Sequence, residues 1–531
     1  MVCYDPMSLV RQMLSLSRTA RLCLILILSL EISSHAADWP QYRGPNHNGI
    51  SSERINKDWT GSVTNPVWLV NLTNGLTSLT VSSGRVFTQV GGDLDVDTAP
   101  PYQLARKEFC VALSADTGGI LWSTETEASD SHLFPDLGVG YTDDGPRSTP
   151  VANGDSVYVL SSYLKLYRLK AADGSIIWST NLVEGFGGYV IAWQNAASPV
   201  IEDGRVFVNA NSPSASLMAF DATNGTLIWR SQNEAMTQST PTIATINGIR
   251  QVIFATQSGL VSVNPQTGSL IWKTNYPFSY STSIGASPVV GSNYIFLSAN
   301  YSMSGFVVQI IATNGAQVPV QRWNSTIHRS HWSTPVYYQG SLFGTFYPDH
   351  ALAELRCVDL ASGASRWTAS GFGRGGVMLV GTNLLVSTER GDLALVAAKT
   401  NSFAQLARFQ AIPGYRDDGN KCWNALALSD GQVYIRSTAY AARFDLSVPE
   451  LKLDAPKIAA GKLDLTIRTA TGTPVDSNRL TGMEVRASTN AVLSPVLWTK
   501  LTNSLTLTNG VVSVTNVVAP PPRFFIVSEP K

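Results

Sequence analysis

Aromatic and cationic residues gather in short segments that come directly before the tripeptide Ser-Thr-Pro or a variant of it. Indole rings can stack on a planar ligand, and guanidinium groups can pair with an anionic one. If these segments converge in the fold, they form a binding site for such a ligand; the alternative is that they pack a channel and hydrogen-bond loops. The candidate ligand-binding residues are Arg147, Trp193, Gln194, His328, His331, Trp332, Arg374 and Trp423.

A second internal match falls at the same place. The stretch Tyr141-Thr-Asp-Asp-Gly-Pro-Arg147 corresponds to Tyr415-Arg-Asp-Asp-Gly-Asn-Lys421, and each stretch places a cation shortly after an Asp-Asp-Gly turn. These two stretches could bring two cations to one site, or the Asp-Asp-Gly turns could only shape the connections between strands.

Two short patterns fall short of a metal site. His328-x-x-His331 offers two imidazoles, but the sequence supplies no third zinc ligand nearby. The run Asp93-x-Asp95-x-Asp97 begins like a calcium loop, yet Thr98 and Leu104 replace its glycine and its bidentate glutamate. No nucleophile elbow, P-loop or HExxH motif occurs either. We therefore assign no metal ligand and no catalytic residue.

One repeated phrase indicates which elements position these segments. Residues 112–122 read Ala-Leu-Ser-Ala-Asp-Thr-Gly-Gly-Ile-Leu-Trp, and similar phrases recur at intervals of 43 to 56 residues. Asp or Asn opens a tight turn, Gly supplies positive φ, and the indole covers the seam between neighbouring sheets. A period of this length with strand-forming residues predicts a β-propeller. The predicted docking tryptophans are Trp68, Trp122, Trp178, Trp229, Trp272, Trp323 and Trp367.

The units of this repeat number eight. Each contains short β-branched and aromatic runs separated by Asn-Gly or Asp-Gly turns, which predicts four antiparallel strands per unit. The last unit lacks its own outer strand, and the segment Pro66–Val70 is free to complete it and close the ring. The inner strands are expected to start near Leu76, Ser148, Ala197, Ser239, Ala286, Ser333, Gly375 and Asn424.

The repeat stops after residue 446. Residues 447–456 are interpreted as a linker, and residues 457–531 contain runs that alternate with period two, such as Lys462–Arg468. We predict a small C-terminal β-sandwich there. The fold class is therefore all-β: an eight-bladed propeller over residues 37–446 followed by the sandwich.

The N-terminus is typical of an exported protein. Arg18 and Arg21 precede the apolar run Leu22–Leu30, and Ser34-His-Ala36 offers a small-x-small cleavage site, so residues 1–36 are predicted to be a signal peptide. The apolar run is too short to span a bilayer, which needs about 20 residues, and no transmembrane segment is expected. We expect a periplasmic or extracellular protein.

Charge and cysteine content exclude other classes. Lys and Arg number 38 and Asp and Glu number 38, so the chain has no basic footprint for nucleic acid. After cleavage Cys110, Cys357 and Cys422 remain, which allows one disulfide at most. We expect a monomer.

The phrase Ala-x-Asp-x-x-Thr-Gly-x-x-x-Trp resembles the tryptophan-docking repeat of pyrroloquinoline quinone (PQQ) propellers. Quinoprotein alcohol dehydrogenases and BamB-like outer-membrane assembly proteins share this repeat. The resemblance covers residues 38–446, and the opening Asp38-Trp-Pro-Gln-Tyr-Arg-Gly-Pro-Asn-His-Asn-Gly is similar to the start of a secreted bacterial subgroup.

The resemblance implies two functions. BamB-like relatives imply a non-catalytic scaffold that binds a protein or a ligand at the cell envelope, without a cofactor. Quinoprotein dehydrogenases imply PQQ, Ca²⁺ held by carboxylates, an Asp base and a disulfide between adjacent cysteines. This chain has no adjacent cysteines and no clear carboxylate set. We favour the scaffold and keep a PQQ-dependent oxidoreductase as the alternative.

Overall fold

The computed structural model describes residues 38–92, 107–128, 145–278, 284–301, 303–347, 352–413, 420–455, 457–459, 462–475, 477–490, 492–494, 497–518 and 524–529. The chain divides into two compact units, Ala36–Ser447 and Val448–Lys531. The predicted signal peptide, the Asp93–Asp97 pattern and the two Asp-Asp-Gly turns fall wholly or largely outside the described residues.

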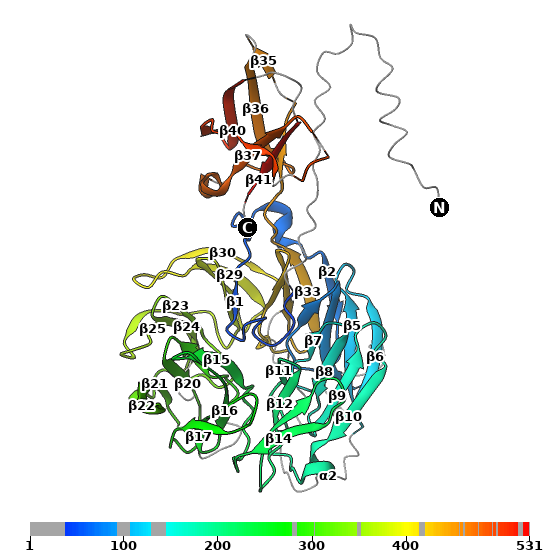
Figure 1. The fold of residues 1–531 in the computed structure, drawn as a ribbon, viewed down its shortest axis with the longest axis vertical. Coiled ribbons are helices and arrows are strands. Elements are labelled where there is room, and N and C mark those ends of the chain that lie inside the picture. The colour runs from blue at the N-terminus through cyan, green and yellow to red at the C-terminus, as the bar shows by residue number, and fades with distance from the viewer. Residues whose placement is uncertain are drawn as a thin grey trace. The chain divides into compact units, whose positions relative to one another are not determined.

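The first unit contains eight sheets, each with four antiparallel strands and one with an added fifth strand, which follow one another in chain order around a ring (Figure 1). The prediction of a propeller of four-stranded blades is thereby confirmed. Blade 1 consists of β3 (Thr80–Ser82), β4 (Arg85–Gly91), β5 (Lys107–Ser114) and β6 (Ile120–Ala128), and blade 2 of β7 (Val151–Asn153), β8 (Ser156–Leu160), β9 (Lys165–Lys170) and β10 (Ile176–Asn181). Blade 3 consists of β11 (Val200–Glu202), β12 (Arg205–Asn209), β13 (Leu217–Asp221) and β14 (Leu227–Ser231), and blade 4 of β15 (Thr242–Ile246), β16 (Ile249–Thr256), β17 (Gly259–Val263) and β18 (Leu270–Lys273).

The second half of the ring follows the same plan. Blade 5 consists of β19 (Val289–Gly291), β20 (Tyr294–Leu297), β21 (Gly305–Thr313) and β22 (Ala316–Ser325), and blade 6 of β23 (Val336–Tyr338), β24 (Ser341–Phe346), β25 (Glu354–Asp359) and β26 (Ser365–Ala369). Blade 7 consists of β27 (Val377–Val380), β28 (Asn383–Ser387), β29 (Asp392–Ala397) and β30 (Gln405–Gln410), and blade 8 of β31 (Ala427–Ser429), β32 (Gln432–Arg436) and β33 (Tyr440–Asp445) with β2 (Trp68–Asn71). Short helical segments are η1 (Gly61–Thr64) and α2 (Leu182–Phe186). No helix among the described residues is long and apolar enough to cross a membrane.

Burial explains the composition of the strands. Central strands such as β8 are buried at every position because the sheets of neighbouring blades cover both of their faces. They are therefore apolar runs without alternation. Outer strands such as β10 leave Ile176 and Ile177 exposed. The three described cysteines of the ring are buried free thiols.

The repeated phrase builds the seam between blades. The Trp122 indole donates to the Ala171 carbonyl of the next blade (3.0 Å) and lies over Gly174, where an added Cβ would come within 2.6 Å of the ring. The same donation to the following blade is made by Trp68, Trp178, Trp229, Trp323 and Trp367.

Trp272 departs from this pattern. Its indole donates to Gln251 Oε1 within its own blade (2.6 Å), because blade 5 turns through a tight hairpin at Asn314-Gly315 in place of the Asp-x-x-Thr-Gly turn. The Ile310 carbonyl of blade 5 instead accepts from Asn247 of blade 4 (3.0 Å). The seam is held by a different side chain.

The ring closes as predicted at its outer edge. Strand β2 pairs antiparallel with β33, so the N-terminal part of the chain completes blade 8. One further pairing was not predicted: β1 (Ile50–Ser51) runs parallel to the inner strand β27 of blade 7.

A belt of hydrogen bonds joins the inner ends of the blades. At the second position of the Ser-Thr-Pro tripeptide or its variant, the backbone N–H donates to the hydroxyl at the equivalent position of the next blade. These donations run from Ser78 to Thr149 (3.2 Å), Thr149 to Ser198 (2.9 Å), Ser198 to Thr240 (2.9 Å), Ser287 to Thr334 (3.0 Å) and Ala425 to Ser78 (3.0 Å). The last one links blade 8 to blade 1.

The second unit has two sheets around a common apolar core. They contain β34 (Leu451–Leu453), β35 (Lys457–Ala459), β36 (Lys462–Thr469), β39 (Leu505–Thr508) and β40 (Val511–Val518), and β37 (Glu484–Ser488), β38 (Thr499–Lys500) and β41 (Phe524–Ser528), with η3 (Ser477–Gly482) between β36 and β37. Residues 451–453, predicted to be linker, instead form strand β34, because Leu451 and Leu453 alternate into this core.

Candidate functional site

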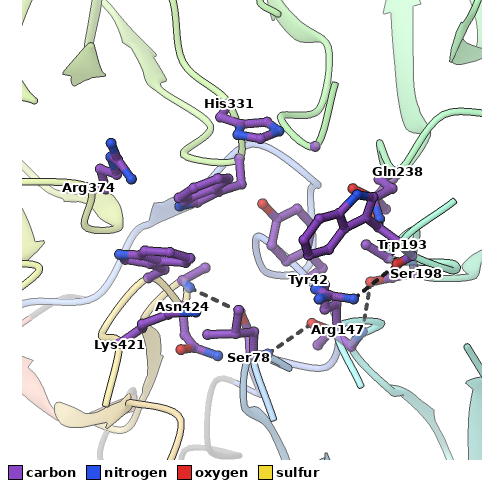
Figure 2. Close-up of a pocket in the computed structure, with 18 of the residues that line it drawn as sticks. Tyr42, Ser78, Arg147, Trp193, Ser198, Gln238, His331, Arg374, Lys421 and Asn424 are labelled. Atoms are coloured by element: carbon purple, nitrogen blue, oxygen red, sulfur yellow. Dashed lines mark hydrogen bonds between the residues drawn. The ribbon is translucent and has the colours of Figure 1, made fainter. Parts of the chain in front are cut away.

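The segments before the inner strands converge on a cavity of about 700 Å³ at the centre of the ring (Figure 2). All eight blades and the N-terminal segment contribute to its wall, because each blade points its inner strand toward the channel. The lining residues are Tyr42, Leu76, Ser78, Arg147, Thr149, Trp193, Ala196, Ser198, Gln238, Thr240, Gly285, Tyr301, His331, Trp332, Arg374, Lys421, Trp423, Asn424 and Ala425.

One side of the cavity is an aromatic stack between cations. Trp332 and Trp423 lie with ring centroids 4.3 Å apart and planes inclined by 31°. The Arg374 guanidinium lies 5.7 Å from the Trp332 ring, and Lys421 Nζ lies 4.9 Å from the Trp423 ring. Cations over indole faces gain from the ring quadrupole, so the charges are held beside the aromatic surface.

Other groups fix this stack from behind. Glu389 accepts hydrogen bonds from Trp423 Nε1 (3.0 Å) and from the Arg374 backbone (3.3 Å). The Arg374 guanidinium also lies 4.9 Å from the Tyr347 ring. Burial raises the pKa of Tyr347, although Arg374 acts in the opposite direction. Tyr347 therefore stays a neutral support.

Another part of the wall presents Trp193, whose side chain is 40% exposed. Its carbonyl accepts from Arg147 Nη1 (3.0 Å) and from Gln238 Nε2 (3.1 Å), both of which line the cavity. Trp193 and Gln194 both have positive φ, 64° and 61°. Two consecutive non-glycine residues in this region are strained, and such strain clusters at functional sites.

The charged groups among the described residues of the wall all have one sign. Arg147, Arg374 and Lys421 are the charged lining residues, and no carboxylate is among the described residues of the wall. Polar neutral groups, including Ser198, Thr240 and Asn424, complete it. This arrangement is suited to an anionic ligand with a flat face.

Comparisons with known proteins agree with this fold. The sequence profile of the family described as outer membrane protein assembly factor BamB matches residues 106–369. The BamB of Moranella endobia is 27% identical over an alignment that covers 39% of this chain and 53% of the BamB. The BamB of Yersinia pestis is 28% identical over an alignment that covers 32% of this chain and 39% of the BamB. The chain thus spans about half or less of these curated relatives.

Solved structures extend the likeness over more of the chain. The quinohaemoprotein alcohol dehydrogenase of Comamonas testosteroni covers 84% of this chain and 84% of its own, with a TM-score of 0.53 and 12% identity. The enzyme of Pseudomonas putida HK5 covers 80% and 83%, with a TM-score of 0.52 and 12% identity. The chain carries PQQ-type propeller repeats and is similar to BamB proteins over its central region. At these identities the solved structures establish its fold alone.

The described residues of the cavity do not supply the ligands that a calcium-assisted quinone needs. No carboxylate lines the described wall, and no cluster of three or more His, Cys, Asp or Glu that could hold a metal occurs among the described residues. The nearest carboxylate named above, Glu389, is engaged behind Trp423. A calcium ion would lack ligands there.

Six of the eight predicted residues of this PQQ-repeat propeller line the cavity: Arg147, Trp193, His331, Trp332, Arg374 and Trp423. Their role in binding remains a prediction. Lys421, which the Asp-Asp-Gly match singled out, lines it as well.

Gln194 and His328 do not line the cavity, which corrects the prediction for both. The positive φ of Gln194 turns its side chain to the Tyr163 hydroxyl (3.1 Å). His328 is buried at the seam to blade 6, where its Nε2 lies 3.0 Å from the Gly363 carbonyl oxygen. Burial lowers the pKa of His328, so the ring is a neutral seam residue.

Sequence reasoning missed Tyr42, Gln238 and Tyr301. Tyr301 packs edge-on against His331 with centroids 4.7 Å apart. Gln238 directly precedes Ser239-Thr-Pro, so its position was a usable signal. Tyr42 belongs to the opening motif, and no spacing rule connects that motif to the cavity.

Proposed function

We propose that this PQQ-repeat propeller is an exported, non-catalytic binding protein of the cell envelope, which takes an anionic, flat-faced ligand in its central cavity. The observation that carries this proposal is the composition of the wall: three cations and exposed indole faces, with no carboxylate among the described lining residues. Binding requires only complementary charge and surface, whereas the dehydrogenase chemistry of the fold family requires a metal and a base.

The envelope location and a protein partner rest on the likeness to outer membrane assembly factors named BamB. Protein binding would use surfaces outside the cavity. The outer strands expose apolar residues such as Ile120 and Leu121, which offer an edge to an extended segment of a partner.

The test is a titration of the purified mature protein with PQQ, with and without Ca²⁺, followed by tryptophan quenching. Trp193→Phe should reduce the quenching, whereas Trp498→Phe in the second unit serves as the matched control. Benzene-1,3,5-tricarboxylate provides a planar anion without redox chemistry, and a neutral benzene triamide provides its uncharged counterpart. We expect saturable binding of the anions that does not depend on Ca²⁺.

Dye-linked oxidation of a panel of alcohols and sugars distinguishes the alternative. We expect no turnover with PQQ and Ca²⁺ present. Calcium-dependent binding with turnover would replace the proposal by a PQQ-dependent oxidoreductase. If none of the anions binds, the ligand part of the proposal fails, and capture of partners from an envelope fraction then tests the scaffold part.

A further inference from the structure

The N-terminal segment Asp38–Ser51 crosses the ring. The Pro40 carbonyl accepts from the Ala152 backbone of blade 2 (2.7 Å), and Arg43 donates to the Thr334 and Pro335 carbonyls of blade 6 (2.9 and 2.8 Å). Blades 2 and 6 stand four places apart in a ring of eight sheets, so they face each other. Three residues span only about 10 Å, so the segment must pass through the central channel.

Both ends of the crossing are anchored. On the side of blade 1, Trp39 pairs with Val81 in an antiparallel bridge, and Asp38 accepts from the Ser82 hydroxyl (2.7 Å). Gly44, at φ 76°, lies against the Trp39 ring, and an added Cβ there would come within 2.7 Å of it. These contacts fold the segment into a compact turn.

The other end is held by a buried arginine. Besides its two bonds to blade 6, Arg43 donates from Nε to the His47 carbonyl (3.3 Å) and from Nη2 to the Asn48 carbonyl (2.8 Å). Beyond it, β1 joins the inner strand β27 of blade 7. Arg43 is 5% exposed and donates four hydrogen bonds to carbonyls, so this part of the segment is anchored in the ring rather than loosely attached.

The segment meets the ring on one particular side. Its partners Val81, Ala152 and Leu379 lie within the inner strands, whereas the cavity wall comes from the residues that precede those strands. Tyr42 lines the cavity, with its hydroxyl 3.2 Å from Thr334 Oγ1, and Figure 2 shows its ring among the side chains of the blades. The space left beside Trp39 and Arg43 is about 20 Å³, which is room for one water molecule.

We propose that residues 38–51 are a plug that closes the channel on this side, so that a ligand enters and leaves through one mouth and Tyr42 forms the floor that it contacts. The plug follows from the contacts above and goes beyond the proposed function. Only the contact between Tyr42 and an anionic ligand rests on that function.

The test replaces Tyr42 by cysteine and measures how fast charged thiol reagents reach it. The protein is used without its predicted signal peptide, so its native cysteines are Cys110, Cys357 and Cys422, and all three are buried. If Tyr42 is the floor of the cationic cavity, the anionic 2-sulfonatoethyl methanethiosulfonate should react about tenfold or more faster than the cationic 2-trimethylammonioethyl reagent. Cysteine at the exposed Ser402, on the outside of blade 7, is the control, with a ratio near one.

A second substitution identifies the route. Arg147→Gln together with Arg374→Gln should bring the ratio at Tyr42→Cys most of the way down to that of Ser402→Cys, since Lys421 alone then remains in the wall. The use of a ratio cancels any effect of the cations on the reactivity of the thiol itself. Equal rates for both reagents, a ratio unaffected by the two substitutions, or no labelling at Tyr42→Cys would overturn the proposal.

Hydrogen exchange of the unmodified protein gives an independent measurement, should Tyr42→Cys fail to fold. The amides of Trp39, Gly44 and Gly49 each donate to a backbone carbonyl and should exchange as slowly as those of inner strands. Exchange at the rate of an unfolded chain would also overturn the plug. If the plug passes these tests while neither PQQ nor benzenetricarboxylate binds, the plug stands and the proposed function fails.

Discussion

Trp332 and Trp423 stack across a gap of one blade. Trp332 precedes β23 of blade 6 and Trp423 precedes β31 of blade 8, yet their ring centroids are 4.3 Å apart. Blade 7, which lies between them, has Gly375 and Gly376 directly before β27, where the backbone of its neighbours comes close. A Cβ on Gly375 would come within 1.7 Å of the Ser387 carbonyl oxygen, and one on Gly376 within 2.6 Å of that of Asn424.

Removing the acceptor behind this stack should loosen it. Glu389→Ala takes the partner from Trp423 Nε1 and from the Arg374 backbone, so we expect affinity for a planar anion to fall about tenfold, in line with one or two lost charged hydrogen bonds. The couplet of stacked indoles in circular dichroism should shrink in parallel. Glu389→Gln keeps an acceptor and should lose much less; equal losses in both variants would contradict this account.

The cations should supply most of the affinity. Among the described residues Arg374 forms no salt bridge, and its guanidinium lies over the rings of Trp332 and Tyr347, so Arg374→Gln should weaken anion binding by roughly 10 to 100-fold. Arg366→Gln is the control, since Arg366 lies on β26 in an exposed ion pair with Asp359.

Arg147→Gln combined with Trp332→Ala should abolish binding while the thermal unfolding transition is retained. Unchanged binding in that double variant would remove the cavity from consideration.

The docking glycines should tolerate no side chain. Gly174→Ala forces a Cβ into the Trp122 ring at a positive φ of 74°, and we expect a loss of about 2 to 4 kcal/mol in unfolding free energy. Gly154→Ala has a similar φ of 61° with nothing within 4 Å, so it isolates the backbone cost of about 1 kcal/mol. Denaturant unfolding of both variants measures the difference, and equal losses would show that the indole contact contributes nothing.

Two serines in the belt of hydrogen bonds between blades should differ in how much they contribute to stability. Ser198→Ala leaves the buried Thr149 N–H without its acceptor and should cost about 1 to 3 kcal/mol. The Ser287 hydroxyl has no hydrogen-bond partner in the described structure, so Ser287→Ala should be close to neutral. Thermal unfolding of the two variants is the measurement. A larger loss at Ser287 would mean that the belt does not hold the blades together.

Stability should fall as the pH rises toward neutrality because of Glu108. This carboxyl is buried, and desolvation raises its pKa to about 7, against opposing effects of Ser162 and Arg147. A raised folded-state pKa stabilises the fold fully below about pH 4.5, and that contribution is lost as the pH passes through 7. Glu127, paired with Lys165, faces Glu108 on the neighbouring strand.

Replacing the Glu108 carboxyl tests this pH dependence. Glu108→Gln stays neutral at every pH, so its stability relative to the parent should increase between pH 5 and pH 8. Melting temperatures across that range decide the matter. Glu125→Gln, on the same strand as Glu127 but exposed in its pair with Lys107, should leave the pH profile of the parent in place. A parallel profile for Glu108→Gln would show that Glu108 is charged throughout.

The repeat predicted the fold because each copy carries its own local chemistry. The turn glycine, the tryptophan and the apolar strands act within one blade and its neighbour, so a single copy shows what every copy does. Trp272 shows where this reasoning ends. Its phrase is intact, but the indole binds Gln251 because its neighbour, blade 5, has a different turn.

The sequence could predict a site residue only where the place of that residue along the chain also fixes its place in the ring. Placing cations and indoles before the inner strands was enough to find six lining residues. It failed at Gln194 and His328, because the direction of a loop side chain depends on its own backbone dihedrals and on which seam it meets.

The sequence by itself determined the blades, their order and the segments that lead to the channel, since these depend on local turns and on strand periodicity. Only the tertiary structure decided that Tyr42 meets Trp332 and Trp423 in one cavity, because closing the ring and threading residues 38–51 across it join segments nearly 400 residues apart in the chain. No local pattern records a contact that exists only once the ring is closed.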